Sequence, residues 1–321
     1  MPKFFDTMVS RRLIRIKAYQ VLFAYYKGNK DNVSNAEKEV LYSINKTYEL
    51  YHKIFLLLIE IKDKFETKLE QRKNKKLPSF DDLNPNRKFV DNKVISQLEN
   101  TEAFIDYVDR NKISWKNNTD FIAKIVNKID EEEYFNKYLN VTTDFKADKK
   151  LIIEILENIV LDCEDFTEIL EEDSIYWNDE LEFVFDMILR TFKKLKESHS
   201  EIKLMPLYKS DNDKLFAKDL VAKTILNHTK NVDRIFKYIK NWDSDRLAFT
   251  DSLLMEMAFE EFTQFNDIPV KVTMNEYIEI AKFYSTKQSG QFINGVLDKM
   301  VKDLNEDGVI KKSGLGLKGS I

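Results

Sequence analysis

Glycine is scarce in this chain of 321 residues. It occurs seven times, and none of the seven lies between Gly28 and Gly290. Phosphate-cradling loops such as GxGxxG and the Walker loop need glycine, because their tight turns bring the backbone close to the ligand. The sequence therefore excludes nucleotide enzymes of those classes, and no cofactor is expected.

Cysteine, histidine and long apolar runs are also scarce. Cys163 is the only cysteine, so no intrachain disulfide can form. The three histidines lie far apart and lack zinc-ligand spacing, so no metal site is expected. The longest apolar run, residues 54–59, is far shorter than the roughly 20 residues that cross a bilayer, and residues 1–10 lack the apolar stretch of a signal peptide. We expect a cytoplasmic protein without membrane contact.

What the sequence does contain is helical periodicity. Hydrophobic residues make up 43% of the chain and recur at intervals of three and four, with only five prolines between them. The pattern predicts an all-α fold with helices at residues 11–26, 36–73, 92–110, 119–139, 148–172, 179–198, 213–242, 244–265, 274–284 and 291–304. The tail, residues 306–321, holds four of the seven glycines and is expected to be flexible.

The middle of the chain shows a weak internal similarity. An offset of 65 positions superimposes Asp148 on Asp213 and Leu161 on Leu226, among other pairs. Helical sequences rich in Leu, Lys and Asp also match by chance, so a degenerate repeat and coincidence both remain open.

Positive charge gathers at the start of the chain. The first 30 residues carry a net charge of +6, although the whole chain carries −4. On the predicted first helix, cations and aromatic rings share one face, formed by Arg12, Arg15, Tyr19, Phe23 and Tyr26. Guanidinium groups bind phosphates and rings stack on unpaired bases, so this face suits single-stranded nucleic acid. The alternative is a helix buried on two sides, with Phe23 and Tyr26 in the core.

A more specific pattern lies near the end of the chain. It consists of Pro269, Asn275–Glu276, Ala281–Lys282 and the run SGQFINGVLD at residues 289–298. This pattern resembles the NusB family of transcription antitermination factors. Residues 11–22, with Arg11, Arg12 and Arg15, resemble the arginine-rich opening of the same family.

The resemblance covers residues 11–40 and 213–300. It implies a NusB-like helical bundle enlarged by an inserted helical region. The expected organisation is a basic helix and the start of the NusB-like core at residues 1–45, an insertion at 46–205, the C-terminal part of the core at 206–305, and a flexible tail at 306–321.

The resemblance also implies a function without catalysis. Family members pair with NusE, a ribosomal protein of the small subunit, and bind boxA, a short single-stranded element of nascent ribosomal RNA, to act on the RNA polymerase elongation complex. Carried over by position, the RNA-binding residues are Arg11, Arg12, Arg15, Gln20, Phe23, Ser289, Gln291, Phe292 and Asn294. Asp251 falls at the position that faces NusE.

Local chemistry agrees with part of this transfer, and one residue departs from the family. Ser289 is suited to cap the helix that it precedes, by accepting from the amide of Gln291 or Phe292. Asn294 has an amide edge that can read a base, although a purely structural role is equally open. Glu256 stands where the family typically has Arg, near the NusE-facing region.

Two other functions compete with the RNA-binding hypothesis. One is a protein-interaction scaffold with the NusB fold, in which the insertion dominates. The other is an accessory role in RNA modification, since NusB-like domains precede some RNA methyltransferases. The lack of a glycine-rich cofactor loop disfavours a methyltransferase in this chain.

Overall fold

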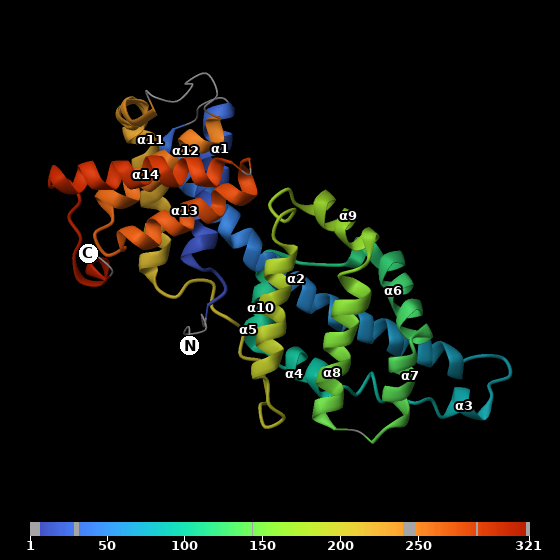
Figure 1. Cartoon of the computed structure of the whole chain (residues 1–321). Helices are drawn as coiled ribbons and strands as arrows, with labels where there is room; N and C mark the ends of the chain where they lie inside the picture. The colour runs from blue at the N-terminus through green and yellow to red at the C-terminus, as the bar shows by residue number, and fades with distance from the viewer. Residues whose placement is uncertain (1–6, 29–31, 143, 240–247, 287, 319–321) are drawn as a thin grey trace. The chain divides into compact units, whose positions relative to one another are not determined.

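The computed structural model describes residues 7–28, 32–142, 144–239, 248–286 and 288–318 (Figure 1). Within these ranges the chain forms fourteen α-helices, a π-helical segment and short 3₁₀ turns, with no strand. The predicted all-α fold is therefore confirmed. No helix in the described ranges is both long and apolar enough to cross a membrane.

The chain divides into two compact units. Unit 1 contains residues 1–44 and 208–321, and unit 2 contains residues 45–207. The long helix α2 (Val33–Lys73) contributes to both. Unit 1 is thus built from two segments distant in the chain, whereas unit 2 is continuous.

Unit 1 is organised around α12. Besides the start of α2 it contains α1 (Arg11–Lys27), α11 (Asp211–Ile239), α12 (Phe249–Gln264), α13 (Val270–Tyr284) and α14 (Ser289–Glu306). Helix α12 packs against α1, α11, α13 and α14. It is apolar around most of its circumference, so residues 253–262 are all buried, including three glutamates. Each of these glutamates needs a polar partner from a neighbouring helix, which shapes the site described below.

Unit 2 surrounds the rest of α2. Its helices are α3 (Phe80–Leu83), α4 (Lys93–Glu99), α5 (Glu102–Asn111), α6 (Thr119–Glu131), α7 (Glu133–Asn140), α8 (Phe145–Ile155), α9 (Glu164–Asp173) and α10 (Leu181–Lys194), with a π-helical segment at Leu156–Val160. Two buried tryptophans fix the core to α2, since the ring N–H of Trp115 donates to the carbonyl of Lys53 (2.9 Å) and that of Trp177 to the carbonyl of Lys46 (2.8 Å).

Three predicted helices are in fact broken. The helix expected at 92–110 divides at Asn100 and Thr101, where Thr101 donates its hydroxyl back to the carbonyl of Gln97. The helix at 119–139 divides at Glu132, whose backbone is extended. The helix at 148–172 is divided by the π-helical segment and the turn that follows it, and helical structure resumes in α9. None of the three breaks contains Pro or Gly, and the spacing of apolar residues stays helical across them, so the sequence predicted continuous helices.

The two stretches related by the internal similarity do not fold alike. Residues 148–189 contain α8, the π-helical segment, α9 and part of α10, whereas their proposed counterparts at 213–254 include most of the single helix α11. The expectation of two similar helical units at this offset is therefore not met, and a degenerate repeat stays an untested hypothesis.

The tail is also more ordered than its glycines suggested. The amide of Ser313 donates to the carbonyl of Asn266 (2.9 Å), and the Lys312 ammonium donates to the carbonyls of Glu261 and Phe265 at the end of α12. Gly316 lies so close to Asn266 that a Cβ at this position would be 2.0 Å from its carbonyl oxygen. The expectation of a flexible tail is therefore wrong for residues 306–318, while 319–321 lie outside the described residues.

Candidate nucleic-acid interface

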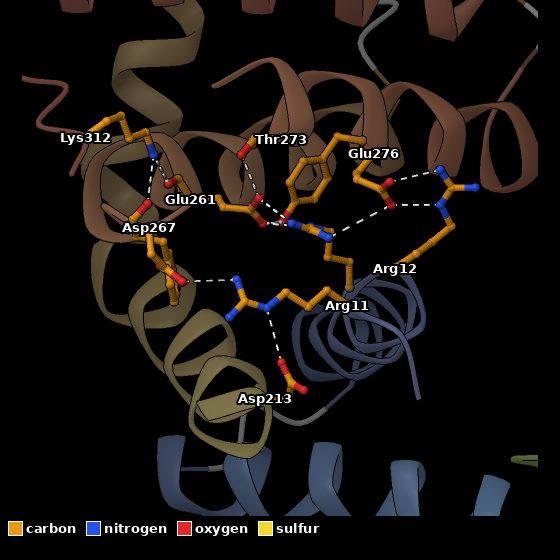
Figure 2. A network of polar contacts seen from close by, with 11 residues as sticks. Arg11, Arg12, Asp213, Glu261, Asp267, Thr273, Glu276 and Lys312 are labelled. Carbon is orange, nitrogen blue, oxygen red and sulfur yellow. Dashed lines mark hydrogen bonds and ion pairs between the residues drawn. The ribbon is translucent and has the colours of Figure 1, made fainter. Parts of the chain in front are cut away.

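Helix α1 begins where the sequence predicted. Ser10 is its N-cap, with the side-chain oxygen accepting from the amide of Leu13 (3.2 Å). The first turn carries two arginines and no acidic residue, which is unfavourable near the positive end of a helix. Carboxylates from neighbouring helices compensate for this charge (Figure 2).

Arg11 and Arg12 pair with carboxylates at the surface. Arg11 contacts Asp213 (3.2 Å) on α11 and Asp267 (3.3 Å), and Arg12 makes a bidentate pair with Glu276 on α13 (2.8 and 2.9 Å). The side chain of Arg12 remains 51% exposed. The hydrogen bonds to Glu276 raise the pKa of Arg12 and use its Nε and Nη2 atoms. A guanidinium has donors on three nitrogens, so Nη1 is left to face another acceptor.

Arg15 lies in the interior, which corrects its predicted role. Its side chain is 2% exposed and makes two hydrogen bonds to Glu261 on α12, at 2.6 and 2.8 Å. Glu261 also accepts from the hydroxyls of Thr273 (2.6 Å) and Tyr277 (3.3 Å). Burial opposes the charged form of Arg15, but Glu261 outweighs it and raises the Arg15 pKa. Arg15 therefore holds α1 against α12 and α13, and the prediction that it contacts RNA is wrong for this conformation.

The aromatic face of α1 is largely packed against other helices. Tyr19 is buried against Tyr284 at the end of α13, with ring centroids 5.2 Å apart. Phe23 meets Phe249 of α12 edge-on at 5.6 Å, and Tyr26 stacks on His228 of α11 at 4.4 Å. The alternative interpretation placed Phe23 and Tyr26 in the core, but both are only half-buried. The buried ring of this face is Tyr19, which that alternative did not name.

A cluster of hydroxyl groups joins α12, α13 and α14. The hydroxyl of Ser285 donates to Asp251 (2.5 Å) and lies 2.9 Å from that of Ser289, which lies 2.8 Å from that of Thr286. Ser289 is buried and is the first residue of α14. The N-cap is Gln288, without a side-chain cap. The predicted capping by Ser289 is therefore wrong, because its side chain is held by hydroxyls of the preceding turn.

The first turns of α14 nevertheless present polar groups to solvent. Gln291 and Asn294 are exposed and three residues apart, so they share a helix face, and Phe292 between them is half-buried. Gly295 has open space around its Cα, so it does not serve a close helix approach.

Helix α1 lies alongside the second half of α13. Arg12 contacts Glu276 near the middle of α13, while Gln20 donates to the hydroxyl of Tyr284 (3.2 Å), the last residue of that helix. Eight residues of helix separate Arg12 from Gln20, which is about 12 Å along α1. Helix α14 begins at Ser289, five residues after Tyr284, so its first turn follows closely in the chain on this contact between α1 and α13.

The predicted partner contact at Asp251 is not accessible. Asp251 is 5% exposed, and its carboxylate is occupied by Ser285. Glu256 is also buried, with one oxygen 2.7 Å from Nδ1 of His228, and burial with the nearby Glu260 raises the pKa of Glu256 to about 8. Neither side chain is placed to touch a partner protein directly, so the departure at Glu256 alters the interior rather than the surface.

Sequence reasoning missed the residues that organise this site. Glu261, Glu276 and Tyr284 receive the polar groups of α1. Glu261 and Tyr284 belong to unremarkable helical stretches, and Glu276 was noted only as part of the family pattern, without a role as a partner of α1. The one available signal was the pair Glu260–Glu261 inside the apolar run MAFEEF, since buried carboxylates require cationic partners. No cluster able to hold a metal ion occurs in the part of the chain described.

Comparison with known proteins identifies a family for the C-terminal part of the chain. The sequence model of the NusB family matches residues 181–302. The transcription antitermination protein NusB of Salinibacter ruber is 39% identical over 115 residues, which are 36% of this chain and 72% of the relative. The chain belongs to the NusB family.

Other NusB proteins match over a smaller share of their length. Those of Chloroherpeton thalassium and Methylacidiphilum infernorum are 42% and 44% identical, over 50% and 57% of their own length and over 32% and 25% of this chain. No solved structure matches the chain significantly. The NusB match begins in α10, so most of unit 2 lies outside it.

Proposed function

We propose that this chain is an RNA-binding antitermination factor that binds boxA-like single-stranded RNA together with NusE during ribosomal RNA transcription. RNA polymerase is reached indirectly, through this complex, in the cytoplasm. The proposed role is binding rather than catalysis, in keeping with a family whose members are in general not enzymes.

The observation that carries this proposal is the surface shared by α1 and the α13–α14 turn. It combines two exposed or half-exposed arginines with amides and rings, which are the groups that bind phosphates and unpaired bases. Its proposed RNA contacts are Arg11, Arg12, Gln20, Phe23, Gln291, Phe292 and Asn294. Arg15 and Ser289 act behind this surface, by holding α1 and the start of α14 in place.

Asp251 has a comparable supporting role in the proposed NusE interaction. It fixes Ser285 and, through it, the turn between α13 and α14. A partner that contacts this turn would depend on Asp251 without touching it, so Asp251→Asn is expected to weaken NusE and RNA binding together.

The decisive experiment measures RNA affinity against salt. A fluorescently labelled single-stranded RNA carrying a boxA-like element is titrated with the full chain, with and without NusE, and followed by anisotropy. Arg12→Gln should weaken binding about three- to tenfold and reduce the slope of log K against log salt by about 0.7, the value for one phosphate contact on a single strand.

A matched control is available on unit 2. Arg110 is an exposed arginine near the end of α5, and Arg110→Gln should leave affinity and slope unchanged. A salt-independent affinity would reject the RNA-binding role and favour the scaffold hypothesis. Equal losses for Arg12 and Arg110 would indicate nonspecific attraction rather than the proposed surface.

A further inference from the structure

Unit 2 exposes three large apolar side chains within seven residues. Leu77, Phe80 and Leu83 are 92%, 79% and 55% exposed, in the loop that follows α2 and in the short helix α3. Single exposed apolar residues are ordinary on protein surfaces, but a local group of this kind marks an interaction site. We call these three residues the loop surface. It lies at the C-terminal end of α2 (Figure 1).

The loop surface is held in a defined conformation by polar contacts. Ser79 and Asp82 form a reciprocal capping box, and Asp82 also pairs with Lys75 at 2.8 Å. Beyond α3, the side-chain amide of Asn86 donates to the carbonyl of Leu139 (3.0 Å). The backbone is thus fixed while the apolar side chains remain in water, so their exposure does not result from a loose segment.

A pocket lies next to the loop surface. It has a volume of about 270 Å³, and its apolar lining comes from Phe65, Leu69, Phe89 and Phe135. Asp81 and Asn84, which flank Phe80 and Leu83 in the chain, are part of its polar rim. Pockets for cofactors and drug-sized ligands hold about 300–1,000 Å³. This smaller pocket fits a single apolar side chain better than a free ligand.

The loop beside the pocket carries a net positive charge, although Asp81 and Asp130 are among the residues that line the pocket. Residues 72–88 include six basic and two acidic residues. Lys73 and Arg87 form ion pairs, with Glu70 and Glu66 respectively. Arg72, which lines the pocket, and Lys76 are exposed, and among the described residues neither has a carboxylate within ion-pair distance. An acidic partner would supply the missing charge.

Two features favour a protein over RNA as this partner. Bases stack on aromatic faces, but two of the three side chains of the loop surface are leucines, which offer no such face. The lining of the adjacent pocket combines apolar side chains with polar ones, and its apolar part resembles the grooves that accept the apolar face of an amphipathic helix.

We propose that the loop surface and its pocket are a docking site for an acidic segment of another protein that carries apolar side chains at helical spacing. One apolar side chain of the partner enters the pocket, others cover Leu77, Phe80 and Leu83, and its carboxylates meet Arg72 and Lys76. This site is separate from the RNA surface of unit 1 and does not depend on the proposed function.

The test uses a display library of short peptides with fixed Leu or Phe at helical spacing and randomised flanking residues. The library is selected on the full chain and then depleted on the Arg72→Glu/Lys76→Glu/Phe80→Ala variant. The three side chains are exposed, so the variant should retain the far-UV circular dichroism and thermal midpoint of the parent. Enrichment of Asp and Glu in the flanking positions is expected.

A selected acidic peptide is then synthesised and measured by anisotropy. Phe80→Ala, and separately Arg72→Glu/Lys76→Glu, should each weaken binding at least about tenfold. Two control variants should bind as the parent does. Leu226→Ala removes an equally exposed leucine from α11 in unit 1, and Lys64→Glu reverses an exposed charge on α2.

Three results would overturn the proposal. They are failure to enrich any peptide, enrichment without acidic preference, and binding that the control variants reduce as much as the loop-surface variants do. A short single-stranded RNA that displaces the peptide from the parent protein, but not from the Phe80→Ala variant, would assign the surface to RNA instead. Binding of boxA-like RNA to unit 1 is measured in parallel, so the two proposals fail independently.

Discussion

Arg12 and Arg15 stand one helical turn apart on α1, and the structure predicts opposite effects for their removal. Arg15 and Glu261 form a desolvated bidentate pair, with side chains 2% and 0% exposed. Removing one member of such a pair leaves a buried charge uncompensated, which costs about 3–5 kcal/mol. Arg12→Met instead breaks an ion pair with a half-exposed member, which costs at most about 1 kcal/mol.

The size of the Arg15 effect makes it easy to detect. Domains are typically stable by about 5–15 kcal/mol, so Arg15→Met should remove a large part of the stability of unit 1. Arg15→Glu should be worse, because it places a second carboxylate beside Glu261. The double variant Arg15→Met/Glu261→Gln should recover at least about 2 kcal/mol, because the introduced amide carries no charge and its oxygen can still accept from Thr273 and Tyr277.

Hydrogen exchange measured by mass spectrometry suits this test, because it reports the opening of α1, α12 and α13 separately from unit 2. RNA affinity is measured on the same proteins under conditions where each is folded. The expected pattern is a large stability loss with only a small affinity loss for Arg15→Met, and a larger affinity loss with little stability loss for Arg12→Met. An Arg15→Met protein of unchanged stability but weakened RNA binding would refute the assignment of Arg15 to the interior.

Three further predictions concern stability. Burial raises the pKa of Glu256 to about 8, so its protonated form is favoured in the fold. The protonated Glu256 contributes to the free energy of unfolding. This contribution is complete below the ordinary carboxyl pKa and is lost as the pH rises through about 8. The free energy of unfolding of unit 1 should therefore fall less steeply with pH in Glu256→Gln than in the parent, as measured by hydrogen exchange or urea titration between about pH 5 and 8. An identical pH dependence in the two proteins would contradict the raised pKa. Lys312→Met removes the donor to two carbonyls at the end of α12 and should cost about 1 kcal/mol in urea denaturation, whereas no loss would show that the tail contact is not stabilising. Gly316→Ala should cost about 1–3 kcal/mol of stability, because its Cβ has no room beside Asn266. Gly295→Ala lies on an open helix surface and should stabilise the protein by about 0.5–1 kcal/mol. Thermal melting that ranks the two variants in the other order would contradict this packing.

The sequence predicted helix boundaries well where a local signal, such as a capping residue, sets the boundary. Residues 11–26 were expected as the first helix, and α1 spans Arg11–Lys27 because Ser10 provides its cap. The break at Glu132 could not be predicted from the sequence. The backbone of this residue is extended, but glutamate is common within helices and gives no sign of a break. Local signals fix where a helix starts more reliably than where tertiary packing interrupts it.

For the candidate site, the sequence could not predict which side chains lie at the surface and which lie in the interior. The pattern could associate the chain's opening with residues 289–298 as one surface, yet it could not distinguish Arg12 from Arg15. That distinction depends on the packing of α12 and α13, which buries Glu261 completely beside Arg15 and leaves Glu276 partly exposed between Arg12 and Arg15. Ser289 shows the same limit, since its hydroxyl had two possible sets of partners and the turn before α14 supplies the closer one.

The discontinuity of unit 1 affects how the protein is made. Glu261 follows Arg15 by 246 residues, so a ribosome adding about 5–20 residues per second leaves the first helix without its buried partner for about 10 to 50 seconds. The continuous residues 45–207 emerge in that interval and form their own core. Newly synthesised α1 must therefore keep its apolar side chains from misassociating until the last third of the polypeptide appears, and a stalled or truncated product would expose them.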